Sequence, residues 1–422
     1  MGILRILGWG ILRTPPVTGV TARSSRMGQS RAKQPHPLAT GACYVLREKE
    51  RMTVPNPADP QGSPFRERPM LVFWETTKAC LLACRHCRAT AQREPLPGEL
   101  DTAEGEALLR EIRSFGDPPP VVIFTGGDLL MRPDIDHLLR YAQGLGLHTA
   151  AAPAATPLLS RDALLRLLDA GVHSISLSLD APGEAHDAIR GVPGTFERTL
   201  QAARDALSVG LQVQVNTVVM RSTLGTLPDV AALMLREGIP VWEVFYLIVT
   251  GRALEADALT PQEQYEVAQF LLEASRYDLL VRTVEAPFIR RALLERTQGE
   301  AAGPLALRLT EHLAQQAGAP PHDVRIGRRG TLDGDGILFV GYDGTISPGG
   351  FLPVELGNVR TGSLAAAYRE HPLLQSIRAR EFDGNCGRCA YRTVCGGSRA
   401  RAYAASGDPL ASDPACPFAA AD

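Results

Sequence analysis

Three observations predict an α/β fold built on a parallel sheet. Between residues 70 and 254, short β-branched or apolar runs alternate with helix-length segments whose leucines recur every three or four residues. Strands that alternate with crossover helices form parallel sheets. Glycines follow several helical segments, where a left-handed helix end is needed. Six strand–helix units are fewer than the eight of a closed barrel, so the pattern indicates an open barrel or a doubly wound sheet.

The repeating units can be placed along the chain. The expected strands cover residues 71–74, 121–125, 147–151, 174–179, 212–219 and 241–248. Helical spacing is clear at 104–115, where Asp101 and Glu104 form a capping pair, and at 161–170. The expected helix-ending glycines are Gly171, Gly210 and Gly238.

After residue 254 the regular alternation ends. Helical patterns cover 261–276 and, with interruptions, 290–319, and short strands are expected at 337–340 and 345–347. From Cys386 onward the chain is rich in loops and cysteine, which predicts a small domain held by metal and not by an apolar core.

Composition limits the class of protein. The 422 residues are 45% hydrophobic and 21% charged, as in an ordinary globular protein. The sequence contains no run of eighteen apolar residues, so no membrane-spanning helix is expected. Residues 1–51 hold nine Lys/Arg and two Asp/Glu, whereas the remainder holds 35 basic and 44 acidic residues. An acidic body argues against nucleic-acid binding. The basic leader has the composition of an organelle transit peptide. The alternative is that the sequence has an overlong start and that Met52 is the true first residue.

Seven of the eight cysteines fall into two groups, which predicts metal sites in a reducing compartment. The first group is Cys80-x3-Cys84-x2-Cys87, directly after the first strand. Three thiolates on a four-iron cluster leave one iron open for catalysis. The alternatives are a zinc site closed by His86 or Cys43, or a cluster fully ligated through Cys43.

The second group is Cys386-x2-Cys389-x5-Cys395-x20-Cys416. Four thiolates complete either a [4Fe-4S] cluster or a structural zinc site, and spacing alone does not decide between them.

Polar residues also gather at the carboxyl ends of the expected strands, where parallel sheets place their ligands. The Gly126-Gly127 turn permits close backbone approach, and Ser178 and Asp180 suit ribose hydroxyls. Arg190 follows the fourth strand, and Asn216 and the segment from Tyr246 to Arg252 complete this rim. A solvated surface charge is the alternative for Arg190, and ordinary strand-end polarity is the alternative for the others.

The first cysteine group, opening a domain of βα repeats, resembles the radical S-adenosylmethionine (SAM) superfamily. The resemblance implies a partial (β/α)6 TIM-like barrel in which Cys80, Cys84 and Cys87 hold a catalytic [4Fe-4S] cluster whose open iron chelates SAM. Reductive cleavage of SAM then gives a 5′-deoxyadenosyl radical that takes hydrogen from substrate. The implied cofactor-binding residues are His86, Gly126, Gly127, Asp128, Ser178, Asp180, Arg190 and Asn216. Asp128 stands where the family's Gly-Gly-Glu-Pro turn has Glu, so its backbone role transfers better than its side chain.

The second group resembles the SPASM extension of radical SAM maturases. Residues 347–350 and 397–399 lack the cysteines of a further cluster, so we expect one auxiliary [4Fe-4S] cluster bound by Cys386, Cys389, Cys395 and Cys416. The expected organisation is a leader (1–69), a radical SAM core (70–255), a helical linker (256–330) and a small loop-rich C-terminal iron–sulfur domain (331–422).

Several segments resemble radical enzymes that modify haem side chains, which implies an oxidation or decarboxylation in tetrapyrrole biosynthesis. These are residues 396–403 and Glu285-Ala-Pro287, although Phe288 stands where His is expected. The alternatives are a maturase of a ribosomally made peptide and, in another class, a non-catalytic zinc or electron-transfer protein. The expected partners are a tetrapyrrole-like or peptide substrate and an electron donor such as flavodoxin or ferredoxin, without nucleic acid or membrane, in the cytoplasm.

Overall fold

A computed structural model describes residues 63–327 and 330–418. Most of the expected leader, including Cys43 and Met52, lies outside these residues. No helix in the described ranges is long and apolar enough to cross a membrane.

The described strands form one sheet in the order β11-β10-β9-β1-β2-β3-β4-β5-β6-β7, with β8 paired to β9. Strands β1 to β7 are parallel to their neighbours, and β9 also pairs in parallel with β1. The strands are β1 (Leu71–Glu75), β2 (Val121–Thr125), β3 (Thr149–Ala151), β4 (Val172–Ser178), β5 (Gln212–Val219), β6 (Val241–Tyr246), β7 (Leu280–Val284), β8 (Leu332–Asp333), β9 (Gly336–Val340), β10 (Thr345–Ser347) and β11 (Gly357–Asn358).

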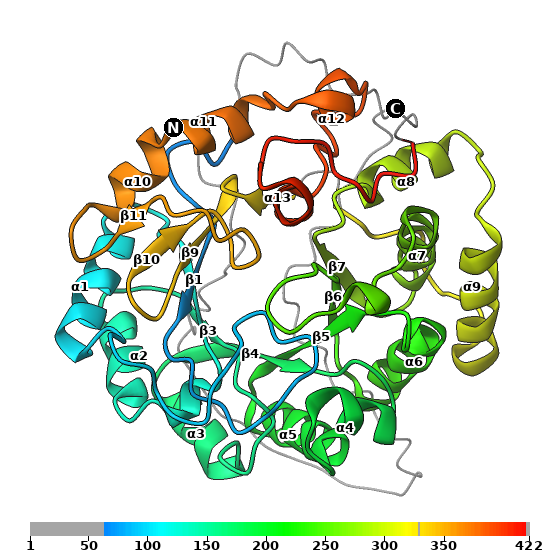
Figure 1. The fold of residues 1–422 in the computed structure, drawn as a ribbon. Helices are drawn as coiled ribbons and strands as arrows, with labels where there is room; N and C mark the ends of the chain where they lie inside the picture. The colour runs from blue at the N-terminus through cyan, green and yellow to red at the C-terminus, as the bar shows by residue number, and fades with distance from the viewer. Residues whose placement is uncertain (1–62, 328–329, 419–422) are drawn as a thin grey trace, which may run out of the picture. The chain divides into compact units, whose positions relative to one another are not determined.

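Helices follow most strands and lie on the outer side of the curved sheet (Figure 1). They are α1 (Thr102–Arg113), α2 (Ile135–Gly144), α3 (Arg161–Asp169), α4 (Glu184–Arg190), α5 (Thr195–Val209), α6 (Leu227–Glu237), α7 (Pro261–Ala274), α8 (Ile289–Thr297), α9 (Pro304–Ala317), α10 (Leu364–Glu370), α11 (Pro372–Ala379), α12 (Gly384–Arg388) and α13 (Arg399–Ser406).

The two faces of the sheet differ in burial. In β5 and β6 every second residue is buried, and the residues between are partly buried or, at Gln212, exposed. The buried set faces the helices, because Trp242 packs against Phe270 of α7 and Trp74 lies against Gly105 of α1. The partly exposed set, which includes Asn216 and Glu243, therefore lines the inner face. An inner face that the protein leaves partly uncovered is suited to hold ligands.

The partial barrel predicted from the sequence is confirmed, and β2, β5 and β10 match the expected strands residue for residue. The capping box of Asp101 and Glu104 is present, and Gly210 and Gly238 end α5 and α6 in the left-handed conformation. Three strands were not expected: β7, which lies within the segment interpreted as a helical linker, and the two-residue strands β8 and β11. The expected domain boundaries at 255 and 330 remain a prediction, and β9, from beyond the second boundary, extends the core sheet.

Candidate functional site

Cys80, Cys84 and Cys87 lie in the loop that leaves the carboxyl end of β1, and none is in a disulfide. The Cys80 sulfur accepts a hydrogen bond from the Leu82 amide at 3.4 Å. Burial raises the pKa of the Cys80 thiol to about 11, and the negative charges of Asp128, Cys84 and Cys87 add to this. Cys80 is therefore a thiol at neutral pH until a metal replaces its proton.

The loop after β2 holds the start of this cysteine loop through backbone contacts. The Gly127 amide donates to the Thr77 carbonyl at 2.8 Å, and the Asp128 amide donates to the Ala79 carbonyl at 2.7 Å. A Cβ atom at Gly127 would lie 2.3 Å from the Ala79 oxygen, so only glycine fits. The close backbone approach expected at the Gly126-Gly127 turn is therefore made to the cysteine loop.

The end of α4 holds the middle of the cysteine loop. The Ala83 amide donates to the Arg190 carbonyl at 3.0 Å, and the Arg85 amide donates to the Ile189 carbonyl at 2.8 Å. The Arg190 side chain also reaches the cysteines, because its Nη1 lies 3.6 Å from the Cys84 sulfur. Arg190 is thereby both a backbone and a side-chain neighbour of the candidate cluster.

Arg190 is held in turn by Asp180, which follows β4. The two side chains form an ion pair at 2.6 Å, and the Val218 amide donates to Asp180 Oδ1 at 3.0 Å. Burial alone would raise the pKa of Asp180, but the neighbouring Arg190, His86 and His186 outweigh it and lower the pKa. Asp180 has no exposed surface, so a contact with ribose would require this ion pair to open.

His86, the residue before the third cysteine, lies in the same buried network. Burial lowers its pKa to about 4, so the ring is neutral at pH 7. Its Nδ1 atom is buried and has no hydrogen-bond partner among the described residues. An unpaired buried nitrogen is costly unless a ligand satisfies it, which fits a bound cofactor at this point.

Three further residues were expected to contact the cofactor: Asp128 is buried, whereas Ser178 and Asn216 are partly exposed. The Asp128 carboxylate is fully buried and accepts from the Leu130 amide at 3.1 Å and from the Thr156 hydroxyl at 2.8 Å, so its side chain serves the local turn. Ser178 and Asn216 are register partners on the inner face and are partly exposed. These two side chains line the uncovered face of the sheet, as a ligand contact requires.

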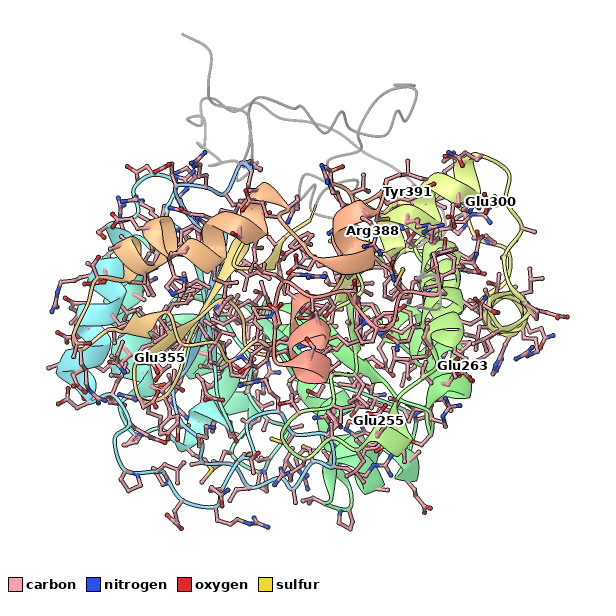
Figure 2. All side chains as sticks on the ribbon, turned by 45° about the horizontal axis from the view of Figure 1, so that its top comes forward. Glu255, Glu263, Glu300, Glu355, Arg388 and Tyr391 are labelled. Atoms are coloured by element: carbon pink, nitrogen blue, oxygen red, sulfur yellow. The ribbon has the colours of Figure 1, made fainter. Side chains whose placement is uncertain are left out.

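The second cysteine group lies in the C-terminal segment, where Figure 2 labels Arg388 and Tyr391 beside α8. Arg291 of α8 lies over the Tyr391 ring at 4.5 Å. Amide groups surround the sulfurs, because Asp413 N donates to Cys386 at 3.3 Å, Tyr391 N to Cys389 at 3.3 Å and Gly397 N to Cys395 at 3.5 Å. N–H donors of this kind stabilise sulfur-bound clusters and tune their potentials.

A buried network of charged side chains supports the second group. Arg401 Nη1 donates to both oxygens of Asp413, at 3.0 and 2.9 Å, and Arg401 Nη2 donates to the Glu285 carbonyl at 2.7 Å. The Ser398 hydroxyl donates to the Glu285 carboxylate at 2.5 Å. Because Glu285 directly follows β7, this network joins the C-terminal segment to the barrel.

Glu285 also faces Asp333 of β8 within hydrogen-bonding reach. Burial raises the pKa of both carboxyl groups, and the pKa of Asp333 rises well above its usual range because Glu285 adds its negative charge. Two buried carboxyl groups in this arrangement favour a state in which one proton lies between them.

Across residues 63–327 and 330–418, no three His, Cys, Asp or Glu side chains lie close enough to share a single metal ion. In a four-iron cluster the cysteines bind different irons, so their sulfurs need not converge on one point.

Comparisons with known proteins agree with this geometry. The Radical SAM superfamily family model matches residues 74–234. The chain is 36% identical to the AdoMet-dependent heme synthase of Oleidesulfovibrio alaskensis, over 82% of this chain and 87% of the relative. It is 32% identical to the AdoMet-dependent heme synthase of Methanosarcina barkeri, over 82% of this chain and 96% of the relative.

Among solved structures, Streptococcus suis SuiB bound to S-adenosylmethionine matches with a TM-score of 0.61 at 17% identity, over 83% of this chain and 78% of that one. Native anSMEcpe with bound AdoMet matches with a TM-score of 0.59 at 17% identity, over 82% of this chain and 93% of that one. These likenesses show the fold. Together with the sequence relatives, they show that the chain belongs to the radical SAM superfamily and is an enzyme that uses SAM with a SAM-binding iron–sulfur cluster.

Proposed function

We propose that this enzyme makes haem or a closely related tetrapyrrole by radical oxidation of carboxylate-bearing side chains. The observation that carries the proposal is the match, over more than four-fifths of the chain, to relatives named AdoMet-dependent heme synthase at 36%, 35% and 32% identity. A relative named Fe-coproporphyrin III synthase follows at 28% identity.

The inner face supports a flat apolar substrate with acidic side chains. Phe245 of β6 and Phe351 lie with their ring centroids 6.2 Å apart. Arg88, directly after the third cysteine, lies over the Phe339 ring at 4.8 Å and donates to Glu75 at 2.8 Å. Aromatic surface beside a partly exposed guanidinium suits a macrocycle that carries carboxylates.

Cys80, Cys84 and Cys87 would bind the SAM cluster, and His86, the Gly126-Gly127 turn, Ser178, Arg190 and Asn216 would contact SAM. In this role Asp180 acts through Arg190, and Asp128 through its backbone. The cluster and SAM, when bound, supply a 5′-deoxyadenosyl radical. The residues of this chain fix that assembly at one rim of the sheet, facing the inner side.

Conversion of a propionate side chain to a vinyl group would balance as follows. A C–H bond at the carbon next to the macrocycle would break, and the hydrogen atom would pass to the 5′-deoxyadenosyl radical, which would become 5′-deoxyadenosine. The C–C bond to the carboxylate then breaks, carbon dioxide leaves, a C=C bond forms and one electron is released. Cys386, Cys389, Cys395 and Cys416 would hold an auxiliary [4Fe-4S] cluster that accepts this electron.

The first electron would come from an external donor such as a flavodoxin or ferredoxin. All seven described cysteines are free, which supports a reducing compartment such as the cytoplasm.

The test is anaerobic reconstitution with iron and sulfide, followed by incubation with Fe-coproporphyrin III, SAM and dithionite. Mass spectrometry should detect a tetrapyrrole that has lost carbon dioxide and hydrogen, with one 5′-deoxyadenosine formed for each side chain converted. Formation of 5′-deoxyadenosine without any change in the tetrapyrrole would exclude this substrate. A peptide substrate would then be tested, since relatives named PqqA peptide cyclase match at 28% and 27% identity.

A further inference from the structure

The loop after β6 lies directly on the cysteine loop. Gly251 has a φ of 61°, a conformation that favours glycine. A Cβ atom at this position would lie 2.4 Å from the Cys87 oxygen and 2.6 Å from the Arg88 oxygen. No side chain fits between these backbones, so the two loops are in contact along their main chains.

Arg252, the next residue, donates to three carbonyls of the cysteine loop. Its amide donates to the Cys87 carbonyl at 3.1 Å, and its Nε donates to the Cys84 carbonyl at 3.0 Å. Its Nη1 reaches the Ala91 carbonyl at 3.4 Å. One residue thus fixes the backbone at Cys84 and Cys87 and at Ala91, which follows the third cysteine.

The charge of Arg252 is not balanced by the protein. Neighbouring arginines have acidic partners, Arg190 with Asp180 and Arg88 with Glu75. Within the described ranges Arg252 has no such ion pair, and its Nη2 atom is buried without a hydrogen-bond partner. A guanidinium with a free buried N–H and no counter-ion suits an anionic ligand.

We propose that Arg252 is a positioning residue of the SAM cluster, and that its remaining N–H binds an anionic acceptor of the bound cofactors. Two acceptors share this chemistry, a sulfur of the cluster and the carboxylate of SAM. The proposal rests on a cluster at Cys80, Cys84 and Cys87 and is independent of the tetrapyrrole substrate.

The test compares Arg252→Gln, Arg252→Lys and Gly251→Ala with the matched control Arg204→Gln. Arg204 of α5 pairs with Glu237 on the exposed surface, away from the cysteine loop in sequence and in contacts. Full-length protein is reconstituted anaerobically, and SAM binding is measured by equilibrium dialysis. The EPR spectrum of reduced, SAM-free protein is recorded in a Cys389→Ala background, so that the N-terminal cluster dominates the signal.

If the acceptor is the carboxylate, Arg252→Gln should weaken SAM binding by about tenfold or more, the value of one hydrogen bond between charged groups. If it is a cluster sulfur, the SAM-free EPR spectrum should change as well. Arg252→Lys should recover part of the loss because it keeps the charge, Gly251→Ala should reproduce the loss, and Arg204→Gln should match the wild type.

SAM affinity within about twofold of wild type, with an unchanged EPR spectrum, would overturn the proposal. If Arg252→Gln does not fold, as judged by circular dichroism, the same criterion applies to Arg252→Lys. Because no tetrapyrrole enters these measurements, failure of the proposed substrate leaves their outcome unaffected.

Discussion

The loop of Cys80, Cys84 and Cys87 is held by backbone contacts together with the side chains of Arg190 and Arg252, whereas a network of buried charged side chains links the segment of Cys386, Cys389, Cys395 and Cys416 to the barrel. The loops after β2 and β6 and the end of α4 contact the first loop through amides and carbonyls, and at Gly127 and Gly251 no side chain would fit. The second segment depends on Arg401 and Asp413, and on Glu285, which lies 116 residues before Arg401. The loops of the sheet therefore shape the first cysteine loop, whereas long-range contacts of buried charges join the second cysteine segment to the barrel.

The largest expected effect separates the roles of the two sites. Cys389→Ala removes one of four ligands of the proposed auxiliary cluster, so the iron content should fall from about eight to about four per chain. SAM cleavage under dithionite should persist, while conversion of the tetrapyrrole should fall below detection because the released electron has no acceptor. Full product formation by this variant would show that the second site is not needed for the oxidation.

The next effect concerns the buried ion pair. In Asp413→Asn the Arg401 guanidinium loses its counter-charge, and its side chain is only 10% exposed. The free energy of unfolding in urea should fall by about 3–5 kcal/mol. The matched control is Asp169→Asn, which removes an exposed pair with Arg140 and should cost less than about 1 kcal/mol. Equal costs for the two variants would mean that the buried network does not support the C-terminal segment.

A smaller effect tests the backbone contacts of the first site. Gly127→Ala forces the Ala79 carbonyl away and should destabilise the protein by about 1–3 kcal/mol, with loss of iron from the first cluster. Gly144→Ala adds the same methyl group in α2, where no atom lies within 4 Å, and should be neutral or stabilising by about 1 kcal/mol. If both substitutions are neutral, the cysteine loop is not held by this contact.

The smallest effect is a pH dependence of the Glu285–Asp333 pair. A carboxyl with a raised pKa binds a proton more tightly when folded, so its contribution to stability is present below the unfolded pKa and is lost as pH rises through the folded pKa. In the Asp333→Asn variant the side chain at position 333 no longer titrates. The stability of this variant relative to wild type should therefore rise as the pH increases above the usual carboxyl pKa, measured by urea unfolding at each pH. A difference that does not change with pH would show that the pair is not protonated.

Local patterns predicted much of the fold. The alternation of β5 and the capping box of α1 depend on neighbours in sequence, and both are found as expected. The parallel pairing of β9 with β1 depends on a partner more than 250 residues away. Strand β7 was missed because its five residues, with Arg282 at the centre, resemble a break between helices.

The site was predictable as a set of residue types at strand ends, but its interactions were not. Burial commits the Asp180 carboxylate to Arg190, and sequence alone does not reveal burial. Arg252 carried only the signal of strand-end polarity, since its importance comes from contacts with residues 161 and 168 positions earlier in the chain.

The most direct test of the central claim is to measure 5′-deoxyadenosine formed by anaerobically reconstituted wild type and by the Cys80→Ala/Cys84→Ala/Cys87→Ala variant under dithionite. The wild type should cleave SAM, whereas the variant should not, although it keeps the iron of the C-terminal set. SAM cleavage that survives in the variant, or zinc in place of iron at both sites of the wild type, would contradict the claim.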